Sequence, residues 1–271
     1  MNQAQIVKEF GVKPTIDVNL EINNRVDFLA TYLRGSGQRS YVLGISGGVD
    51  SSTAGRLAQI SVEKLRAADY PAKFIAVRLP YGIQRDEQDA QDAIAAIGAD
   101  LTITVNIKPA VDATMESLGA AGVFDGKTAA EIDFIKGNVK ARERMVVQYA
   151  IAGANKGIVI GTDHAGEALM GFYTKHGDGA CDVIPLTGLN KRQVRLLAKA
   201  LGMPASLYEK PATADLEDLN PGLLDEVSFG VPYDAVDDYL EGQIIDVAHE
   251  TKILRQYAVT QHKRALPVAP Q

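Results

Sequence analysis

Apolar residues return along the chain at two spacings, and segments with one spacing alternate with segments that have the other. A repeat every three to four positions predicts amphipathic helices in the segments 22–33, 54–65, 90–97, 132–149 and 194–201. Short apolar runs bounded by turn residues predict strands at 41–45, 74–79, 101–107 and 157–161. Strands that alternate with helices of this length indicate βαβ units. We therefore expect an α/β fold, a doubly wound parallel sheet with helices on both faces.

Two helix starts carry capping signals, and one long segment carries no clear period. Residues 128–131 (TAAE) form a capping box that opens the long helix, and Asn190 begins another helix. The stretch from Glu209 to Val231 has weak periodicity. Because so long a loop in a compact domain usually has a function, we interpret it as a mobile lid. Two closing helices are expected around 236–240 and 253–254.

Composition restricts the class of protein. The chain has 271 residues, 46% of them hydrophobic and 23% charged, with no internal repeat, so we expect a single domain over residues 1–271. The net charge of −6 disfavours a nucleic acid partner, because binding phosphates along a duplex needs a basic surface. No apolar run reaches the roughly 18 residues of a membrane span, and the N-terminus lacks a signal-peptide core. We expect a cytoplasmic protein with no membrane partner.

The chain has one cysteine, Cys181, and four histidines. One cysteine forms no intrachain disulfide and no cysteine-rich zinc site, and it fits a reducing compartment. The histidines lack H-x-x-x-H spacing, so we do not expect zinc. No base is paired with Cys181 in the sequence, and we interpret its thiol as inert.

The first predicted strand is followed by the segment 46–52 (SGGVDSS), which leads directly into a helix. Glycine lets a ligand approach the backbone closely, and a helix N-terminus presents unpaired N–H groups, so this segment predicts a phosphate cradle. It is not a Walker A loop, and the G-x-G-x-x-G pattern that would favour hydride transfer is also missing. A turn with an architectural role only is the alternative interpretation.

Polar residues also follow two other predicted strands, at 78–82 (RLPYG) and 162–167 (TDHAGE). The carboxyl ends of parallel strands meet at one edge of a sheet. We therefore expect Asp50 and Glu167 to share Mg²⁺ with triphosphate oxygens, and Lys191 to offset phosphate charge. Taken singly, a solvated carboxylate is the more common explanation of Glu167, and a solvated helix turn is that of Lys191.

The chain resembles a known family in several segments. GISGGVDSS resembles the pyrophosphatase loop of synthetases that use ATP to adenylate a substrate oxygen. FIKGNVKARERM, GTDHAGEALMGFYTKHGDGACDVIPLTGLNKRQVR, EKPATADL and QHKR resemble ammonia-dependent NAD⁺ synthetases, in the same order and over most of the chain. The resemblance implies an adenine nucleotide α hydrolase-like fold and a homodimer. It also implies that deamido-NAD⁺, ATP and ammonia are the substrates, with Mg²⁺ as cofactor.

The resemblance also implies roles for individual residues. Mg²⁺ would be bound by Asp50 and Glu167, which with Lys191 make up the catalytic group. ATP would be bound by Gly44, Ile45, Ser46, Gly47, Gly48, Val49, Asp50, Ser51, Arg78, Thr162, Lys191 and Thr213. Deamido-NAD⁺ would be bound by Arg142, Lys175, Asp182, His262 and Lys263.

The implied reaction is consistent with these residue types. A carboxylate is a poor acyl donor until it is adenylated, and ammonia then displaces AMP without a covalent enzyme nucleophile. An acyl-adenylate hydrolyses readily, so we expect the segment 209–231 and the loop 82–86 to exclude water. Family members that use glutamine carry an additional N-terminal glutaminase domain. Because the pyrophosphatase loop starts at residue 44 here, we expect free ammonia to be the nitrogen donor and no glutaminase domain. The long helix from Thr128 is the expected dimer contact.

Two other functions compete with this one. The nearest is another ligase with a pyrophosphatase loop, one that thiolates tRNA or forms GMP. Thiolating enzymes commonly need paired cysteines, and GMP-forming enzymes would lack KGNVKARERM and QHKR. The second is a non-catalytic nucleotide sensor, which would keep the cradle but would form neither AMP nor pyrophosphate.

Overall fold

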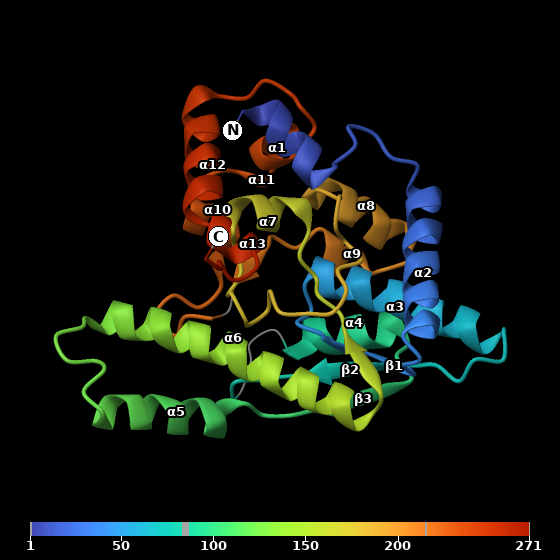
Figure 1. Ribbon diagram of the computed structural model, residues 1–271, viewed down its shortest axis with the longest axis horizontal. Helices are drawn as coiled ribbons and strands as arrows, with labels where there is room; N and C mark the ends of the chain where they lie inside the picture. The colour runs from blue at the N-terminus through green and yellow to red at the C-terminus, as the bar shows by residue number, and fades with distance from the viewer. Residues whose placement is uncertain (1, 83–86, 215, 271) are drawn as a thin grey trace.

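The computed structural model describes residues 2–82, 87–214 and 216–270 of the chain. Its centre is a parallel sheet with the strand order β3-β2-β1-β4 (Figure 1). The strands are β1 (Ser40–Gly44), β2 (Lys73–Arg78), β3 (Leu101–Thr104) and β4 (Gly157–Val159). All of them were predicted, and the parallel pairing of every neighbouring pair confirms the expected sheet.

Each face of the sheet has its own hydrophobic core, because successive strand residues point to opposite faces. Tyr41 and Phe74 are buried on one face, and Val42 and Ile75 are buried on the other. The first face is covered by α2 (Val18–Gly35), α3 (Val49–Arg66), α4 (Glu87–Ile97) and α8 (Lys191–Ala200). The second face is covered by α5 (Lys108–Ala120) and α6 (Ala129–Ala154). Figure 1 shows these helix layers on both sides, so the doubly wound architecture is confirmed.

A third apolar cluster joins the two ends of the chain, with Ile6, Tyr239 and Ile253 fully buried in it. It contains residues of α1 (Gln3–Phe10), α7 (Ala165–Met170), α10 (Asp225–Phe229), α11 (Tyr233–Leu240) and α12 (Val247–Val259). The short helices α9 (Ala205–Tyr208) and α13 (Gln261–Arg264) complete the helical elements of the described ranges. The two closing helices are confirmed as α11 and α12, whereas α1, α5, α7, α9, α10 and α13 were not predicted. No helix in the described ranges is both long enough and apolar enough to cross a membrane.

The strand predicted over 101–107 is shorter than expected and ends at Thr104. Thr104 lies opposite Arg78, the last residue of β2, so the partner strand ends there as well. Ile107 is buried, but as the N-cap residue of α5. Its side chain packs in the contact between the sheet and α5. The alternation of apolar and polar residues therefore continues past the end of the strand.

The long helix α6 has the predicted capping box, in which Thr128 Oγ1 accepts from Glu131 N at 3.3 Å and Glu131 accepts from Thr128 N at 2.8 Å. Not all of the apolar residues that repeat along this helix are buried in the core. Val146 is 51% exposed, whereas Gly137 and Lys140 are buried. The helix therefore turns small and polar residues inward, towards the site described below.

The segment 209–231, which the sequence analysis interprets as a mobile lid, has short elements of its own. β5 (Thr213–Ala214) pairs antiparallel with β6 (Leu223–Leu224), and α10 follows. The absence of periodicity reflects the shortness of these elements, since two-residue strands carry no detectable repeat. Of the second predicted closing loop, residues 83–86 lie outside the described residues.

Candidate active site

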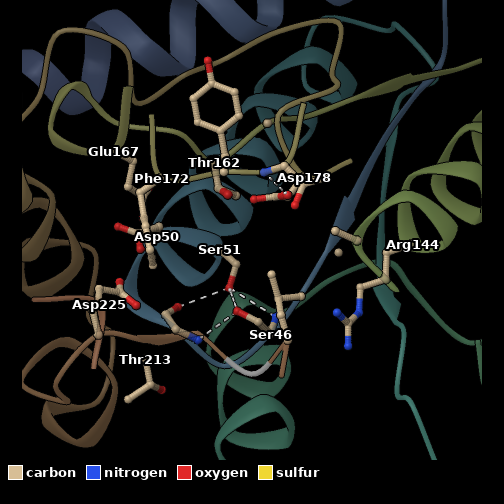
Figure 2. A pocket seen from close by; sticks show the side chains of 18 of the residues that line it. Ser46, Asp50, Ser51, Arg144, Thr162, Glu167, Phe172, Asp178, Thr213 and Asp225 are labelled. Carbon is tan, nitrogen blue, oxygen red and sulfur yellow. Dashed lines mark hydrogen bonds between the residues drawn. The ribbon is translucent and has the colours of Figure 1, made fainter. Parts of the chain in front are cut away.

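A cavity of about 770 Å³ opens at the carboxyl ends of β1, β2 and β4, the edge of the sheet where a site was expected (Figure 2). Residues from widely separated parts of the chain line it. They include Ser46, Asp50, Ser51, Thr162, Glu167, Lys191 and Thr213. The fold thus brings together the residues that the sequence analysis assigned to a triphosphate and its metal ion.

The loop between β1 and α3 leaves its backbone available for a ligand. Gly48 is the N-cap of α3 and makes no side-chain capping bond, so the first N–H groups of an 18-residue helix remain unused by a cap. Ser46 Oγ lies 3.2 Å from Ser51 Oγ, and Ser51 Oγ also donates to Gly48 O. Gly47 has φ +86°, and a Cβ there would lie 2.8 Å from Ala90 N. Only glycine fits this position, and the loop is shaped as an anion cradle.

A buried lysine lies between two carboxylates beside this cradle. Lys191 Nζ is 2.7 Å from Asp50 Oδ2 and 3.7 Å from Glu167 Oε1. The Lys191 side chain is 1% exposed, and its ammonium group lies 4.9 Å from the ring centre of Tyr233. A buried ammonium group is stable only when it is paired, so the two carboxylates fix its place.

Burial and mutual repulsion perturb these groups strongly. Burial and the neighbouring Asp50 raise the pKa of Glu167 well above its usual range. Burial also acts to raise the pKa of Asp50, but Lys191 and His164 outweigh it and the net shift is downward. For Lys191 burial acts to lower the pKa, and Asp50 and Glu167 raise it overall. With both carboxylates ionised, the cluster would carry one negative charge more than Lys191 balances, so a further cation bound here would stabilise the ionised form of Glu167.

The donor set fits a hard divalent cation. One ligand atom each of Asp50, His164 and Glu167 lies within 4.8 Å of the others, and Asp50 Oδ1 is buried without a hydrogen-bond donor in the described ranges. His164 Nδ1 accepts from Gly166 N at 3.1 Å, so the ring proton resides on Nε2. Burial lowers the pKa of His164 to about 3, and the ring is neutral. A protonated Nε2 is no metal ligand, so the carboxylate oxygens remain as the donors that Mg²⁺ prefers.

Four of the five residues assigned to deamido-NAD⁺ lie together. Arg142 donates to Lys175 O, Lys175 Nζ donates to His262 O at 2.7 Å, and Lys263 follows His262. Lys263 also lines the cavity. Its Nζ donates to two backbone oxygens, those of Tyr173 and of Gly171, which is the C-cap residue of α7. These residues form a basic margin at the cavity.

In this structure the side chains of Asp182 and Arg78 are bound to other parts of the protein. Asp182 Oδ2 accepts from Val159 N at 2.8 Å, so this carboxylate extends the edge of β4. The buried guanidinium of Arg78 donates to Ile45 O at 2.9 Å and contacts Glu87 at 2.5 Å. Arg78 supports the start of the cradle loop from behind, and neither residue is among those that line the cavity.

Other lining residues received no role from the sequence. Arg144 lies across the cavity from Asp50 (Figure 2) and donates from Nε to Leu79 O. Asp225 contributes a third carboxylate near Lys191 and is itself buried. Asp178 accepts from Thr174 N at 2.9 Å. Burial together with Asp178 raises the pKa of Asp163 to about 8. Asp163 precedes His164 in the TDHAGE segment, and its place directly after a predicted strand is the sequence signal that could have identified it as a site residue.

A phosphate cradle and a buried ammonium group that share one cavity of a parallel sheet define an α/β enzyme that acts on nucleotide phosphates. Within that class, the model of the family described as NAD synthase matches residues 21–267. The chain belongs to the NAD synthase family.

Individual relatives agree with the family. The chain is 59% identical, over 98% of its length and 94% of the relative's, to a protein of Burkholderia cenocepacia named NH(3)-dependent NAD(+) synthetase. Its fold is similar to the crystal structure of NAD⁺ synthetase from Burkholderia pseudomallei, with TM-score 0.84 and 53% identity, covering 98% and 96% of the two chains. It is also similar to NMN synthetase from Francisella tularensis, with TM-score 0.81 and 32% identity over 94% and 99%.

Proposed function

We propose that this chain catalyses the ATP-dependent amidation of deamido-NAD⁺ by ammonia, giving NAD⁺, AMP and pyrophosphate. The observation that carries the proposal is Lys191 held between Asp50 and Glu167 beside an open helix N-terminus. Such a site accepts the triphosphate of ATP, and the name of the relatives at 59% identity, NH(3)-dependent NAD(+) synthetase, supplies the nitrogen source and the product.

The first step activates the nicotinate carboxylate. A carboxylate oxygen attacks the α-phosphorus of ATP, the O–P bond forms, and the bond from the α-phosphorus to the bridging oxygen breaks as pyrophosphate leaves. Ser46, Ser51 and the N–H groups at the start of α3 would orient the phosphate chain. Thr162 and Thr213 line the same cavity and would bind the nucleotide from other sides.

Charge compensation is the main contribution of the buried cluster. Lys191 Nζ provides positive charge where the leaving pyrophosphate gains negative charge. Asp50 and Glu167 would hold Mg²⁺, which when bound neutralises phosphate charge and lets two anions approach each other. Arg78 would act indirectly, through the Ile45 carbonyl that it holds.

The second step needs a protected carbonyl but no enzyme nucleophile. Ammonia attacks the carbonyl carbon of the adenylate, the C–N bond forms, the C–O bond to AMP breaks, and nitrogen loses a proton. Burial raises the pKa of the Cys181 thiol to about 12, so this cysteine is not a nucleophile at neutral pH. The site's task in this step is to admit ammonia and exclude water.

Nicotinic acid mononucleotide is the second candidate substrate, because one structural neighbour is named NMN synthetase. The dinucleotide carries an additional adenosine phosphate, which needs its own contacts. Arg142, Lys175, His262 and Lys263 offer a basic margin for it. The margin favours deamido-NAD⁺, with Asp182 as a proposed further contact.

One assay tests the function and both substrates. Protein, ATP, Mg²⁺ and ammonium are mixed with deamido-NAD⁺ or nicotinic acid mononucleotide, and AMP, pyrophosphate and the amidated product are measured. We expect NAD⁺ with one AMP for each turnover, much slower use of the mononucleotide, and little product when glutamine replaces ammonium. A sensor would release no AMP, and a preference for the mononucleotide would reassign the substrate.

We also propose a homodimer that uses α6, in the cytoplasm, where its nucleotide substrates are available. The support for the dimer is that α6 carries two large apolar side chains, Phe134 and Val146, that are 60% and 51% exposed. Exposed apolar side chains of this size on a long helix are candidates for burial by a partner.

A further inference from the structure

We propose that Asp218, Lys140 and Asp133 form a latch that fastens the segment 216–219 onto α6 and keeps water from the acyl-adenylate. The proposal rests on the proposed function and assigns positioning roles to residues outside the ATP and metal cluster. Its basis is a set of specific contacts between two segments about 80 positions apart in the sequence.

The first half of the latch is a carboxylate held by two lysines. Asp218 Oδ1 lies 2.6 Å from Lys140 Nζ, and Asp218 Oδ2 lies 2.7 Å from Lys136 Nζ. Lys140 Nζ also donates to Leu216 O at 2.8 Å. Both oxygens of one carboxylate and one backbone carbonyl are thus bound by α6.

The second half of the latch is a carboxylate of α6 that accepts hydrogen bonds from the backbone of the segment. Asp133 Oδ1 accepts from Asp218 N at 2.9 Å, and Asp133 Oδ2 accepts from Leu219 N at 2.8 Å. Between the two halves, a Cβ on Gly137 would lie 3.2 Å from Leu216 Cβ. A glycine here allows the segment to lie directly on the helix.

Charge makes the fastened arrangement the favourable one. The ammonium groups of Lys108, Lys136 and Lys140 all lie 4.4–5.1 Å from the ring centre of Tyr81. Within the described ranges only Asp112 and Asp218 form ion pairs with them. If Asp218 left, the 4% exposed Lys140 side chain would lose its counter-ion and face two like charges. The cluster therefore draws the segment back onto α6.

The latch forms part of the wall of the reaction cavity. Leu216 and Glu217 line the cavity from the segment, and Gly137 and Asn138 line it from α6. Opening the latch would part this wall and admit water. Water would then attack the adenylate carbonyl: the C–O bond to water forms, the C–O bond to AMP breaks, and the products are AMP, deamido-NAD⁺ and a proton. ATP is consumed without NAD⁺ being made.

The test measures AMP and NAD⁺ in the same reaction with Asp218→Asn. This side chain is 44% exposed, so the variant is expected to fold. We expect pyrophosphate release close to wild type but an AMP:NAD⁺ ratio raised by about twofold or more, and further raised at low ammonium. Lys140→Met should raise the same ratio, and the double variant should add little, because the pair acts as a unit.

Asp27→Asn is the control, since it makes the same substitution in a Lys–Asp ion pair away from the cavity, with Lys64, in which both side chains are 57% exposed. Its ratio should stay at the wild-type value. The latch is refuted if Asp218→Asn makes less product with an unchanged ratio, which is the result of a purely structural role. Failure of the wild-type protein to form NAD⁺ would refute the proposed function instead, so the two failures are distinct.

Discussion

Lys191 Nζ lies 2.7 Å from Asp50 Oδ2, although the two residues are 141 positions apart in the chain. Each belongs to the first turn of its helix, Asp50 in α3 and Lys191 in α8. The pair therefore joins two helix N-termini, where backbone N–H groups favour anions. The positive charge beside the proposed phosphate site therefore belongs to a buried helix residue, whose position is fixed by packing, and not to a residue on a loop.

The variant Asp50→Asn tests the metal and charge assignment. We expect pyrophosphate release to fall by at least about 100-fold, because Lys191 loses its ion-pair partner and Mg²⁺ loses a carboxylate ligand. Thermal unfolding followed by circular dichroism should show a folded protein. Turnover within a few-fold of wild type would remove Asp50 from the catalytic group.

The variant Gly47→Ala tests the shape of the cradle. Alanine at φ +86° is strained, and its Cβ would lie 2.8 Å from Ala90 N, so we expect a loss of about 1–3 kcal/mol in unfolding free energy and weaker ATP binding. Gly153→Ala in α6 is the control, because nothing lies within 4 Å of the added methyl group. It should stabilise the helix slightly. Equal behaviour of the two variants in urea titrations would argue against the strain.

Asp237 gives a prediction about pH. Burial raises the pKa of Asp237 to about 6, against the opposing effect of the Arg192 and Lys191 backbone N–H groups that it accepts from. The native state therefore binds this proton more tightly than the unfolded state does. Its contribution to stability is present below pH 4 and is lost as pH rises through about 6.

Asp237→Asn should remove that loss, so its unfolding free energy relative to wild type should rise by about 1–3 kcal/mol between pH 4 and pH 7. Urea titrations at several pH values measure this difference. Asp234→Asn, whose side chain is 89% exposed, should follow the wild-type profile. A constant difference between Asp237→Asn and wild type over the whole range would contradict the assignment.

The thiol of Cys181 should react slowly. Burial, with Asp163 and Asp182 nearby, raises its pKa to about 12, so the thiolate is scarce at pH 8. We expect the native protein to react with a disulfide reagent at least about 100-fold more slowly than free cysteine. Urea should restore the ordinary rate. A fast native reaction would show that the thiol is activated.

The proposed dimer is tested on α6. Val146→Glu puts a charge at a 51% exposed apolar position of this helix and should shift sedimentation towards the monomer. Val247→Glu, at a 74% exposed position of α12, should leave the assembly unchanged. A wild-type protein that sediments as a monomer would exclude the dimer directly.

Much of the fold and part of the site could be predicted from the sequence because their signals are local. The strand before Ser46 and the helix after it are visible in neighbouring residues, and the capping box at Thr128 needs only the residue three positions later. The helix α5 was missed because the strand pattern was extended to Ile107, whose burial arises in a helix contact. The short elements within 209–231 were missed because two-residue strands have no period.

The sequence by itself determined the four strands of the parallel sheet, most of the long helices and the family resemblance, and it predicted the phosphate cradle at 46–52, because each depends on residues a few positions apart. Only the tertiary structure decided that Lys191 neutralises Asp50, that Asp182 supports β4, and that Asp218 is bound by Lys140. Those partners are set by how distant elements pack. Burial then determines the energies, since a charge removed from water must find its counter-charge wherever the fold provides one.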